Sequence, residues 1–341
     1  MSVSSSWDLV HEYLKPIAHL FEMEGVSEIM VNGAGTVFIE RRGEKQRVPA
    51  TFPSEAHLAT TIQQIANATG QSCDKHHHPV VDARLEDGSR VCGVLSSVSP
   101  KGHSLTIRLF PKRRLQAQDL LDMGSLNHDM LDFLQAAVEA KRNILLSGST
   151  GSGKTTFLNM LTGFIPDTER IITVEDTEEL VVDVPNRVSL IAPNTRRDAQ
   201  AQPLSLGFLI RTTLRMNPDR IVVGEIRDAE AAGAFLQAIN TGHNGCASTI
   251  HANHPEDALI RLQNLLGSVG LPIEFVASQV REQYPPVVIQ LGKVPGRGRI
   301  VVLTVAEMDH GRLAHLVGPM IRVSHAHVRR SGLSRCPGSG T

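Results

Sequence analysis

Residues 143–165 read NILLSGSTGSGKTTFLNMLTGFI, and this stretch decides the fold. Its first part, NILLSG, is a continuous apolar run of strand length, and its last part, KTTFLNMLTGFI, has the apolar spacing of a helix. Between them, residues 148–155 satisfy G-x-x-x-x-G-K-[ST], the pattern of a loop that joins a strand to a helix and cradles phosphate groups. The stretch therefore predicts a phosphate-binding loop in an α/β protein.

Each residue type in this loop has a chemical reason to be there. Glycines let the backbone N–H groups turn inward around phosphate oxygens, and the N-terminus of the following helix adds partial positive charge. Lys154 is placed to reach the β- and γ-phosphates, and the Thr155 hydroxyl to ligate Mg²⁺. The candidate nucleotide-binding residues of the loop are Gly148, Ser149, Thr150, Gly151, Ser152, Gly153, Lys154, Thr155 and Thr156.

Two further apolar runs of strand length follow the loop, RIITVE at residues 170–175 and RIVVGE at residues 220–225. A helix is predicted before the loop, at about residues 127–141. Strands that are apolar on both faces and alternate with helices indicate a mostly parallel sheet that is covered on both sides. The fold class predicted for this part of the chain is therefore α/β.

Both of these runs end in acidic residues, which makes Glu175, Asp176 and Glu225 candidates for the site. The carboxyl ends of parallel strands form the edge at which such sheets bind ligands. There, Glu175 and Asp176 can position a water molecule or help to hold Mg²⁺, and Glu225 can orient or deprotonate an attacking water. The simpler alternatives are ordinary loop acids at 175–176 and a strand-end ion pair between Glu225 and Arg227.

Two histidines flank a short strand-like run in TGHNGCASTIHAN, residues 241–253. His243 and His251 can hydrogen-bond a γ-phosphate or orient Glu225. The alternative is that either one is an ordinary loop histidine with satisfied hydrogen bonds. A metal site is disfavoured, because no cysteine and histidine set at zinc spacing accompanies them.

The first 110 residues have the pattern of a separate, smaller α/β unit. Helical spacing runs over residues 7–23, where Pro16 is expected to kink or split the helix. Asn32-Gly33 predicts a hairpin turn between two β-rich runs. A second helix is predicted at 54–69 with Ser54 as its N-cap, and short strands follow within 80–110.

These patterns predict four segments. They are an N-terminal α/β domain, a basic linker, an α/β domain that contains the phosphate loop, and a tail without periodicity that is expected to be disordered, at residues 1–110, 111–125, 126–321 and 322–341.

Composition and charge exclude several classes of protein. The 341 residues include 34 Lys and Arg against 35 Asp and Glu, a net charge of −1, and only 4% are aromatic. This balance argues against a dedicated nucleic-acid binder. No apolar run has the roughly 18 residues of a membrane span, and no signal peptide is predicted in residues 1–15.

The remaining reactive residues are assigned simpler roles. Four cysteines without a C-x-x-C pair are expected to be reduced thiols of a cytosolic protein, and Cys246 a small buried residue rather than a nucleophile. His76, His77 and His78 are expected to form a solvated turn, with adventitious metal binding as the alternative.

Taken together, GSTGSGKTTFLN, RIITVEDTEEL, LRMNPDRIVVGEIRD and NTGHNGCASTIHAN resemble, in order and spacing, the Walker A loop, aspartate box, Walker B motif and histidine box of the type II/type IV secretion ATPases. In the first half, SEIMVNGAGTVFIERRG, PVVDARLEDGSRV and SLTIRLF look like the Tad/Flp-pilus branch, close to the conjugative-transfer ATPases. The resemblance covers about residues 8–310. One departure is Gly207-Phe208, which stands where an Arg-Asp pair is expected, although Arg211 and Arg215 remain in that stretch.

The resemblance implies a RecA-like ATPase core with a smaller PAS-like N-terminal domain, assembled as a homohexameric ring that hydrolyses ATP with Mg²⁺ at clefts between the two domains. It implies that Glu175 and Glu225 polarise the attacking water and that His243 or His251 senses the γ-phosphate. It further implies that N-terminal arginines reach the phosphates. By position, Arg108 is the first choice, followed by Arg90 and Arg84.

The function that the resemblance implies is a cytoplasmic motor, peripherally bound to the inner membrane. It would power pilus assembly, secretion or conjugative transfer through a polytopic platform protein, without direct binding to nucleic acid. Two alternatives stay open at this point. One is a nucleic-acid translocase, since RecA-like rings also drive helicases, and the other is a nucleotide-gated scaffold without useful turnover.

Overall fold

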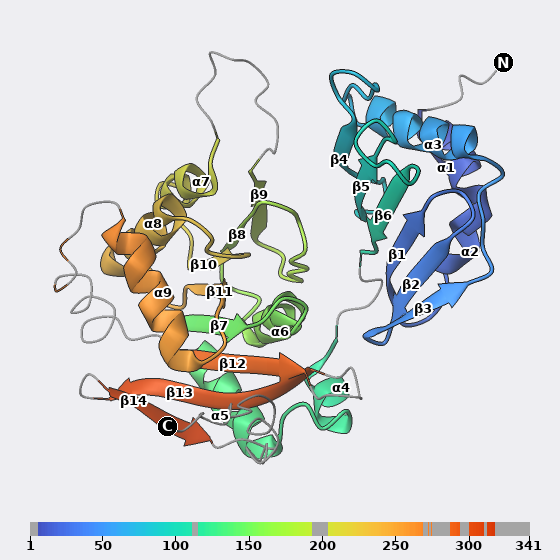
Figure 1. Ribbon diagram of the computed structural model, residues 1–341. Coiled ribbons are helices and arrows are strands. Elements are labelled where there is room, and N and C mark those ends of the chain that lie inside the picture. Colours follow the sequence, from blue (N-terminus) through green and yellow to red (C-terminus); the bar gives the residue numbers. More distant parts are fainter. Residues whose placement is uncertain are drawn as a thin grey trace, which may run out of the picture.

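The structure, a computed structural model, describes residues 6–110, 115–192, 204–268, 272, 274, 287–293, 300–309 and 312–317. The strands of these residues form a six-stranded and an eight-stranded sheet, each in its own lobe (Figure 1). The fold is α/β, as the sequence predicts, and the second lobe contains the phosphate-loop segment. None of the helices described is long and apolar enough to cross a bilayer.

The first lobe is an antiparallel sheet with helices packed against one face. Its strand order is β3-β2-β1-β6-β5-β4, with strands β1 (Val26–Asn32), β2 (Val37–Arg41), β3 (Glu44–Val48), β4 (Val80–Arg84), β5 (Arg90–Val94) and β6 (Ser104–Arg108). Alternate residues of these strands, such as Ile29, Val91 and Ile107, are buried against the helices. The residues between them, including Arg84, Arg90 and Arg108, belong to the opposite face because strand side chains alternate.

The helices of this lobe follow the sequence prediction closely. Pro16 splits the N-terminal helix into α1 (Ser6–Leu14), a 3₁₀ turn and α2 (Ala18–Phe21). The Ser54 Oγ caps α3 (Glu55–Ala68) by accepting a hydrogen bond from His57 N at 3.1 Å. The hairpin predicted at Asn32-Gly33 joins β1 to β2, and Gly33 has a φ of +73°.

The second lobe is built on a mostly parallel sheet of order β14-β13-β12-β7-β11-β10-β8-β9. The run from β12 to β9 is parallel, and β13 and β14 are antiparallel additions. Its strands are β7 (Ile144–Gly148), β8 (Ile171–Glu175), β9 (Arg187–Ile191), β10 (Arg220–Val223), β11 (Ala247–His251), β12 (Val287–Lys293), β13 (Ile300–Asp309) and β14 (Arg312–Val317). The predicted strands at 143–148, 170–175 and 220–225 are confirmed as β7, β8 and β10.

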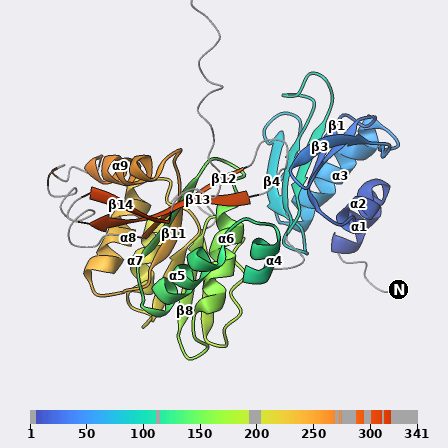
Figure 2. The ribbon, with the colours of Figure 1, turned by 90° about the horizontal axis from the view of Figure 1, so that it is seen from below.

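Helices cover both faces of this sheet, which explains why its strands are apolar on both faces (Figures 1 and 2). One core contains β7 residues such as Leu146 and residues of α5 and α6, and the other contains Leu145 and residues of α7, α8 and α9. The helices are α4 (Ala117–Asp122), α5 (His128–Glu139), α6 (Lys154–Leu161), α7 (Leu206–Thr213), α8 (Ala229–Asn240) and α9 (Pro255–Gly267).

One feature of this lobe differs from the sequence prediction, and another explains why the chain departs from the family pattern at Gly207. The stretch 111–125 is not a plain linker, because it contains α4, whose Leu120 is buried in the core of the second lobe. At Gly207, a Cβ would lie 2.7 Å from the carbonyl carbon of Glu230, so only glycine lets α7 and α8 pack this closely. Residues 111–114 and the tail 322–341 lie outside the described residues.

Candidate functional site

The glycine-rich loop lies between β7 and α6, as predicted. Gly151 and Gly153 have φ angles of +70° and +83°, a backbone conformation that favours glycine. A Cβ at Gly148 would overlap the Ser152 Oγ and would lie 2.8 Å from the Leu291 carbonyl oxygen. The sequence of the loop is therefore required by its backbone path, and α6 begins at Lys154 with its N–H groups at the loop.

Lys154 lies at the centre of the loop. Its Nζ donates hydrogen bonds to the carbonyl oxygens of Gly148 and Ser149, both at 3.0 Å, and to His251 Nδ1 at 3.2 Å. Burial lowers the pKa of Lys154. Burial, and then the adjacent Lys154 ammonium, lowers the pKa of His251, so the imidazole is neutral at pH 7.

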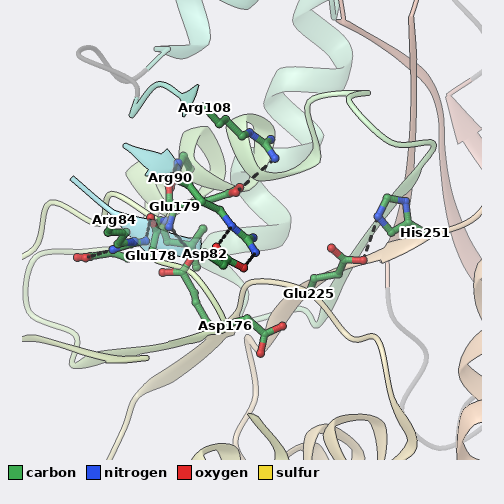
Figure 3. Close-up of polar contacts among 12 residues, drawn as sticks. Asp82, Arg84, Arg90, Arg108, Asp176, Glu178, Glu179, Glu225 and His251 are labelled. Carbon is green, nitrogen blue, oxygen red and sulfur yellow. Dashed lines mark hydrogen bonds and ion pairs between the residues drawn. The ribbon is translucent and has the colours of Figure 1, made fainter. Parts of the chain in front are cut away.

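The contact with Lys154 also assigns the tautomer of His251. An ammonium has no acceptor, so Nδ1 must accept and Nε2 carries the proton. That Nε2 lies 3.0 Å from Glu225 Oε1, and Figure 3 shows the imidazole turned toward the carboxylate. The strand order β7-β11-β10 explains the grouping, because these parallel strands end side by side.

Glu225 is held from its other side by an arginine. Arg227 Nη2 donates to Glu225 Oε2 at 2.9 Å, and Arg227 Nη1 lies 3.5 Å from Asp176 Oδ2. The strand-end ion pair considered from the sequence is therefore present together with the His251 contact. Glu225 Oε1 is buried and makes no hydrogen bond of good geometry within the described part of the chain, so it can accept one from a water molecule or a substrate.

Glu175 is a buried carboxyl with one oxygen satisfied and one not. Its Oε1 accepts backbone hydrogen bonds from Glu179 N at 2.8 Å and Leu180 N at 3.0 Å. Its Oε2 is buried without a hydrogen-bond partner among the described residues. Burial is the main cause that raises the pKa of Glu175 to about 7. Burial also raises the pKa of Asp176, against the opposing charge of Arg227.

The raised pKa of Glu175 predicts that the free energy of unfolding falls as the pH rises. The folded protein holds the Glu175 proton up to about pH 7, whereas an ordinary glutamate loses it near 4.5. The stabilising contribution is thus complete below pH 4.5 and is lost as the pH rises through 7. We expect the free energy of unfolding of the wild type, relative to Glu175→Gln, to fall by up to about 3 kcal/mol between pH 5 and 8. Urea unfolding at several pH values measures this difference, and a constant difference would contradict the assignment.

Three arginines of the first lobe form a row that faces the acidic residues Glu178 and Glu179, which follow β8. Arg84 is in register with Arg90, and Arg90 with Arg108, so their side chains share one face of β4, β5 and β6. Arg84 Nη1 lies 2.9 Å from Glu178 Oε2, and Arg108 Nη1 lies 3.6 Å from Glu179 Oε1 (Figure 3).

Arg90, in the middle of the row, pairs within its own lobe, 2.8 Å from Asp82. Carboxylates therefore compensate three neighbouring positive charges.

Two arginines of the row, Arg90 and Arg108, line the same cleft between the lobes as the phosphate loop. One part of the cleft is bounded by Arg90, Arg108, Thr155, Thr156 and Glu179. The adjoining part is bounded by Thr155, Glu175, Asp176, Glu225 and Arg227. The structure thus brings together residues that are far apart in the sequence, and Thr155 lies where the two parts meet.

His243 is not part of this group. His243 precedes β11, whereas His251 is the last residue of β11. Because β11 has five residues, its two ends are about 13 Å apart. His243 lies at the edge of the sheet where the parallel strands begin. There its Nδ1 is 3.2 Å from Thr241 Oγ1, and its carbonyl oxygen accepts a hydrogen bond from Cys246 Sγ at 3.0 Å. The expectation that His243 reaches the phosphate loop is therefore wrong for this arrangement.

The remaining candidate residues are not part of this group either. Cys246 is buried, as expected, and burial raises its pKa to about 12. His76 and His77 lie in an exposed turn, in which their backbone N–H groups donate to Asp74 Oδ1. Arg211 pairs with Glu230 between α7 and α8. The part of the chain that the structure describes contains no group of three or more His, Cys, Asp or Glu arranged to hold a metal ion.

Sequence reasoning missed two features of the site. Asn159, a buried polar residue on α6, donates to Glu179 O at 2.9 Å and accepts from Val181 N at 2.8 Å, which fastens the acidic segment to the loop helix. Glu178 and Glu179 pair with the arginine row. The available signal was Asn159 itself, a polar residue in the apolar pattern of a helix.

The comparisons with known proteins agree with this geometry. The family model described as type II/IV secretion system protein matches residues 11–280. The chain belongs to this family. It is 35% identical to the conjugal transfer protein TrbB of Rhizobium radiobacter, over 70% of this chain and 72% of TrbB. It is 36% identical to the type IV secretion system protein PtlH of Bordetella pertussis, over 73% of this chain and 79% of PtlH. Membership and the intact phosphate loop make it an ATP hydrolase of the secretion family.

Two other similarities are more restricted, one in the length that is matched and one in sequence identity. The chain is 38% identical to an uncharacterized protein of Methanocaldococcus jannaschii over 64% of its own length, but spans only 31% of that protein. Among solved structures, the Legionella pneumophila ATPase DotB superposes with a TM-score of 0.59 at 20% identity, covering 91% of this chain and 83% of DotB. This likeness to DotB supports the family fold.

Proposed function

We propose that the protein is a motor ATPase that hydrolyses ATP in the cleft between its two lobes to power secretion, pilus assembly or conjugative transfer. The single observation that carries the proposal is that Arg90 and Arg108 of the arginine row and Thr155 of the phosphate loop line one cleft. Guanidinium groups stabilise the charge that spreads over a transferring phosphoryl group. A cleft built from two lobes also couples the chemistry to their relative movement.

Within this cleft the residues divide the work. The phosphate-loop N–H groups and Lys154 bind the phosphates, and Glu225 accepts the proton of the attacking water through its unsatisfied Oε1. His251 lies between Lys154 and Glu225 and thereby links phosphate binding to the orientation of the base. Glu175, protonated up to about pH 7, can donate a hydrogen bond from its free Oε2.

The residues of the cleft also fit a magnesium ion. The Thr155 hydroxyl and the unsatisfied carboxylate oxygen of Glu225 line the same space. Mg²⁺ prefers oxygen ligands and is usually held by one or two protein groups together with substrate phosphates. We assign Thr155 as the residue that would hold it. When bound, the ion neutralises charge on the phosphate oxygens.

The ion pairs between the lobes suggest how nucleotide binding moves them. In the structure, Glu178 and Glu179 pair with Arg84 and Arg108. A bound triphosphate carries more negative charge and competes for the same guanidinium groups. Exchange of carboxylate for phosphate then draws the first lobe toward the loop, and loss of the γ-phosphate releases it.

The assembly and location are part of the proposal. The names of TrbB and PtlH place those relatives in conjugal transfer and type IV secretion. By analogy, this chain forms a homohexamer at the inner face of the cytoplasmic membrane and acts on a polytopic platform protein. The first domain ends at residue 110, and α4 packs on the second domain.

Replacing an arginine of the row tests the proposed site. We expect Arg108→Ala to lower kcat for ATP by about 10²–10³-fold, because the transition state loses a charge partner, and Arg108→Lys to recover only part of it. Steady-state hydrolysis measures this. Arg47→Ala, on the exposed β3 of the same sheet, is the matched control. Turnover of Arg108→Ala within twofold of wild type would remove the row from the site.

A further inference from the structure

Gln290 is a buried amide in the middle of the second sheet. It lies on β12, is only 3% exposed, and is in register with Ser147, the residue before the first loop glycine. Ser147 is in turn in register with Ile250 of β11. Its neighbours on the strand, Ile289 and Leu291, belong to the hydrophobic core. A polar side chain at such a position is costly unless its hydrogen bonds are satisfied.

The hydrogen bonds of Gln290 connect three segments. Its Oε1 accepts from Ser147 Oγ at 2.5 Å. Its Nε2 lies 3.2 Å from the Asn253 carbonyl oxygen and 3.4 Å from that of Ala252. The side chain therefore reaches across β7 and fastens the backbone that leaves β11 to the strand that carries the phosphate loop.

The segment fastened in this way begins directly after His251. The backbone of His251 is in register with Gly148, and its imidazole lies between Lys154 and Glu225. The side chain is 30% exposed, so packing alone does not fix it. The two carbonyl contacts to Gln290 are thus the anchor nearest to His251 on its C-terminal side among the described residues.

We propose that Gln290 is a positioning residue, which holds the exit of β11 so that His251 stays between the phosphate-loop lysine and the catalytic glutamate. This inference rests on the role of His251 given under the proposed function. An amide suits the task because it offers both an acceptor for Ser147 and donors for the carbonyls. A shift of about 1 Å in a catalytic constellation can cost about 10²-fold in rate, so the anchor matters for turnover.

A double-mutant cycle on kcat distinguishes positioning from general stability. The variants are Gln290→Met, which keeps the volume and removes the hydrogen bonds, His251→Ala, and both together. If Gln290 acts through His251, the two effects do not multiply. We expect kcat to fall about 10–100-fold in Gln290→Met, with KM for ATP within about twofold. We expect no further fall when the substitution is added to His251→Ala.

Val288→Ala is the matched control, because Val288 is buried on the same strand two residues earlier and has no polar contact to offer. It should change the melting temperature, leave kcat within about twofold, and act independently of His251→Ala. Ser147→Ala removes the other end of the anchor with a smaller change. It keeps the test decisive if Gln290→Met does not fold, and its effect on kcat should also disappear in the His251→Ala background.

The outcomes separate the two proposals. If His251→Ala leaves kcat unchanged, the role of His251 and the inference both fail. If His251→Ala lowers kcat but the Gln290→Met and Ser147→Ala effects multiply with it, or are absent, the role of His251 stands and the inference is overturned. If Gln290→Met and Ser147→Ala lower kcat only when His251 is present, the inference is supported.

Discussion

Glu225→Gln should bind ATP with near wild-type affinity and hydrolyse it at least about 10²-fold more slowly. The amide keeps the size of the side chain and its contact with Arg227. It can no longer accept a proton at Oε1, the buried atom that lies 3.0 Å from His251 Nε2. Because ATP binding depends on the phosphate loop, the substitution should lower kcat and leave ATP affinity nearly unchanged.

The measurement is Mg²⁺-dependent ATP hydrolysis over a series of protein concentrations, beside nucleotide binding by each variant. Glu139→Gln, an exposed carboxylate at the end of α5, is the isosteric control and should behave as wild type. A specific activity that rises with concentration would indicate that sites are completed by assembly. If wild type turns over no faster than Glu225→Gln at every concentration, Glu225 is not the base and a nucleotide-gated scaffold becomes the better interpretation.

Glu169→Gln should lower the stability of the second lobe by about 3 kcal/mol, although it lies outside the cleft. Glu169 accepts from Arg220 Nε at 2.6 Å, and Arg220 is the largest fully buried side chain of the described residues, at 2% exposed. Arg220 Nη1 also donates to Val138 O at 2.6 Å. Neutralising the carboxylate leaves a buried guanidinium charge without its counter-ion.

Calorimetric or far-ultraviolet circular dichroism melting measures this loss. The fluorescence of Trp7, the single tryptophan, follows the first lobe separately. Exchange of both partners, Glu169→Leu with Arg220→Met, should regain most of the stability, because it removes the buried charge as well as its partner. Glu12→Gln, in the exposed Lys15–Glu12 pair, is the control and should change stability by less than about 0.5 kcal/mol. An equally small effect of Glu169→Gln would show that Arg220 does not need its counter-ion.

The limits of the sequence prediction follow from the range of the interactions involved. Ser54 caps its helix, Pro16 splits one, and Gly151 and Gly153 take positive φ values, because each depends on neighbours a few residues away. The linker prediction failed at α4 because Leu120 is buried by residues distant in sequence.

The two histidines make the same point at the site. By composition and spacing, His243 and His251 are equivalent, since each adjoins the same strand-like run. The direction of β11 in the sheet separates them, with His251 beside Gly148 and His243 at the opposite edge. No local property of either residue distinguishes the two, and only the parallel pairing of β11 with β7 does.

The sequence by itself determined the phosphate loop, the α/β class, the acidic strand ends and the family, because these depend on contiguous residues whose spacing dictates backbone geometry and chemistry. The tertiary structure alone decided the rest. It aligned Arg84, Arg90 and Arg108 against Glu178 and Glu179, and carried the Gln290 amide across β7. The physical reason is that strand order and register join segments through hydrogen bonds and buried charges, whose partners lie tens to more than a hundred residues apart.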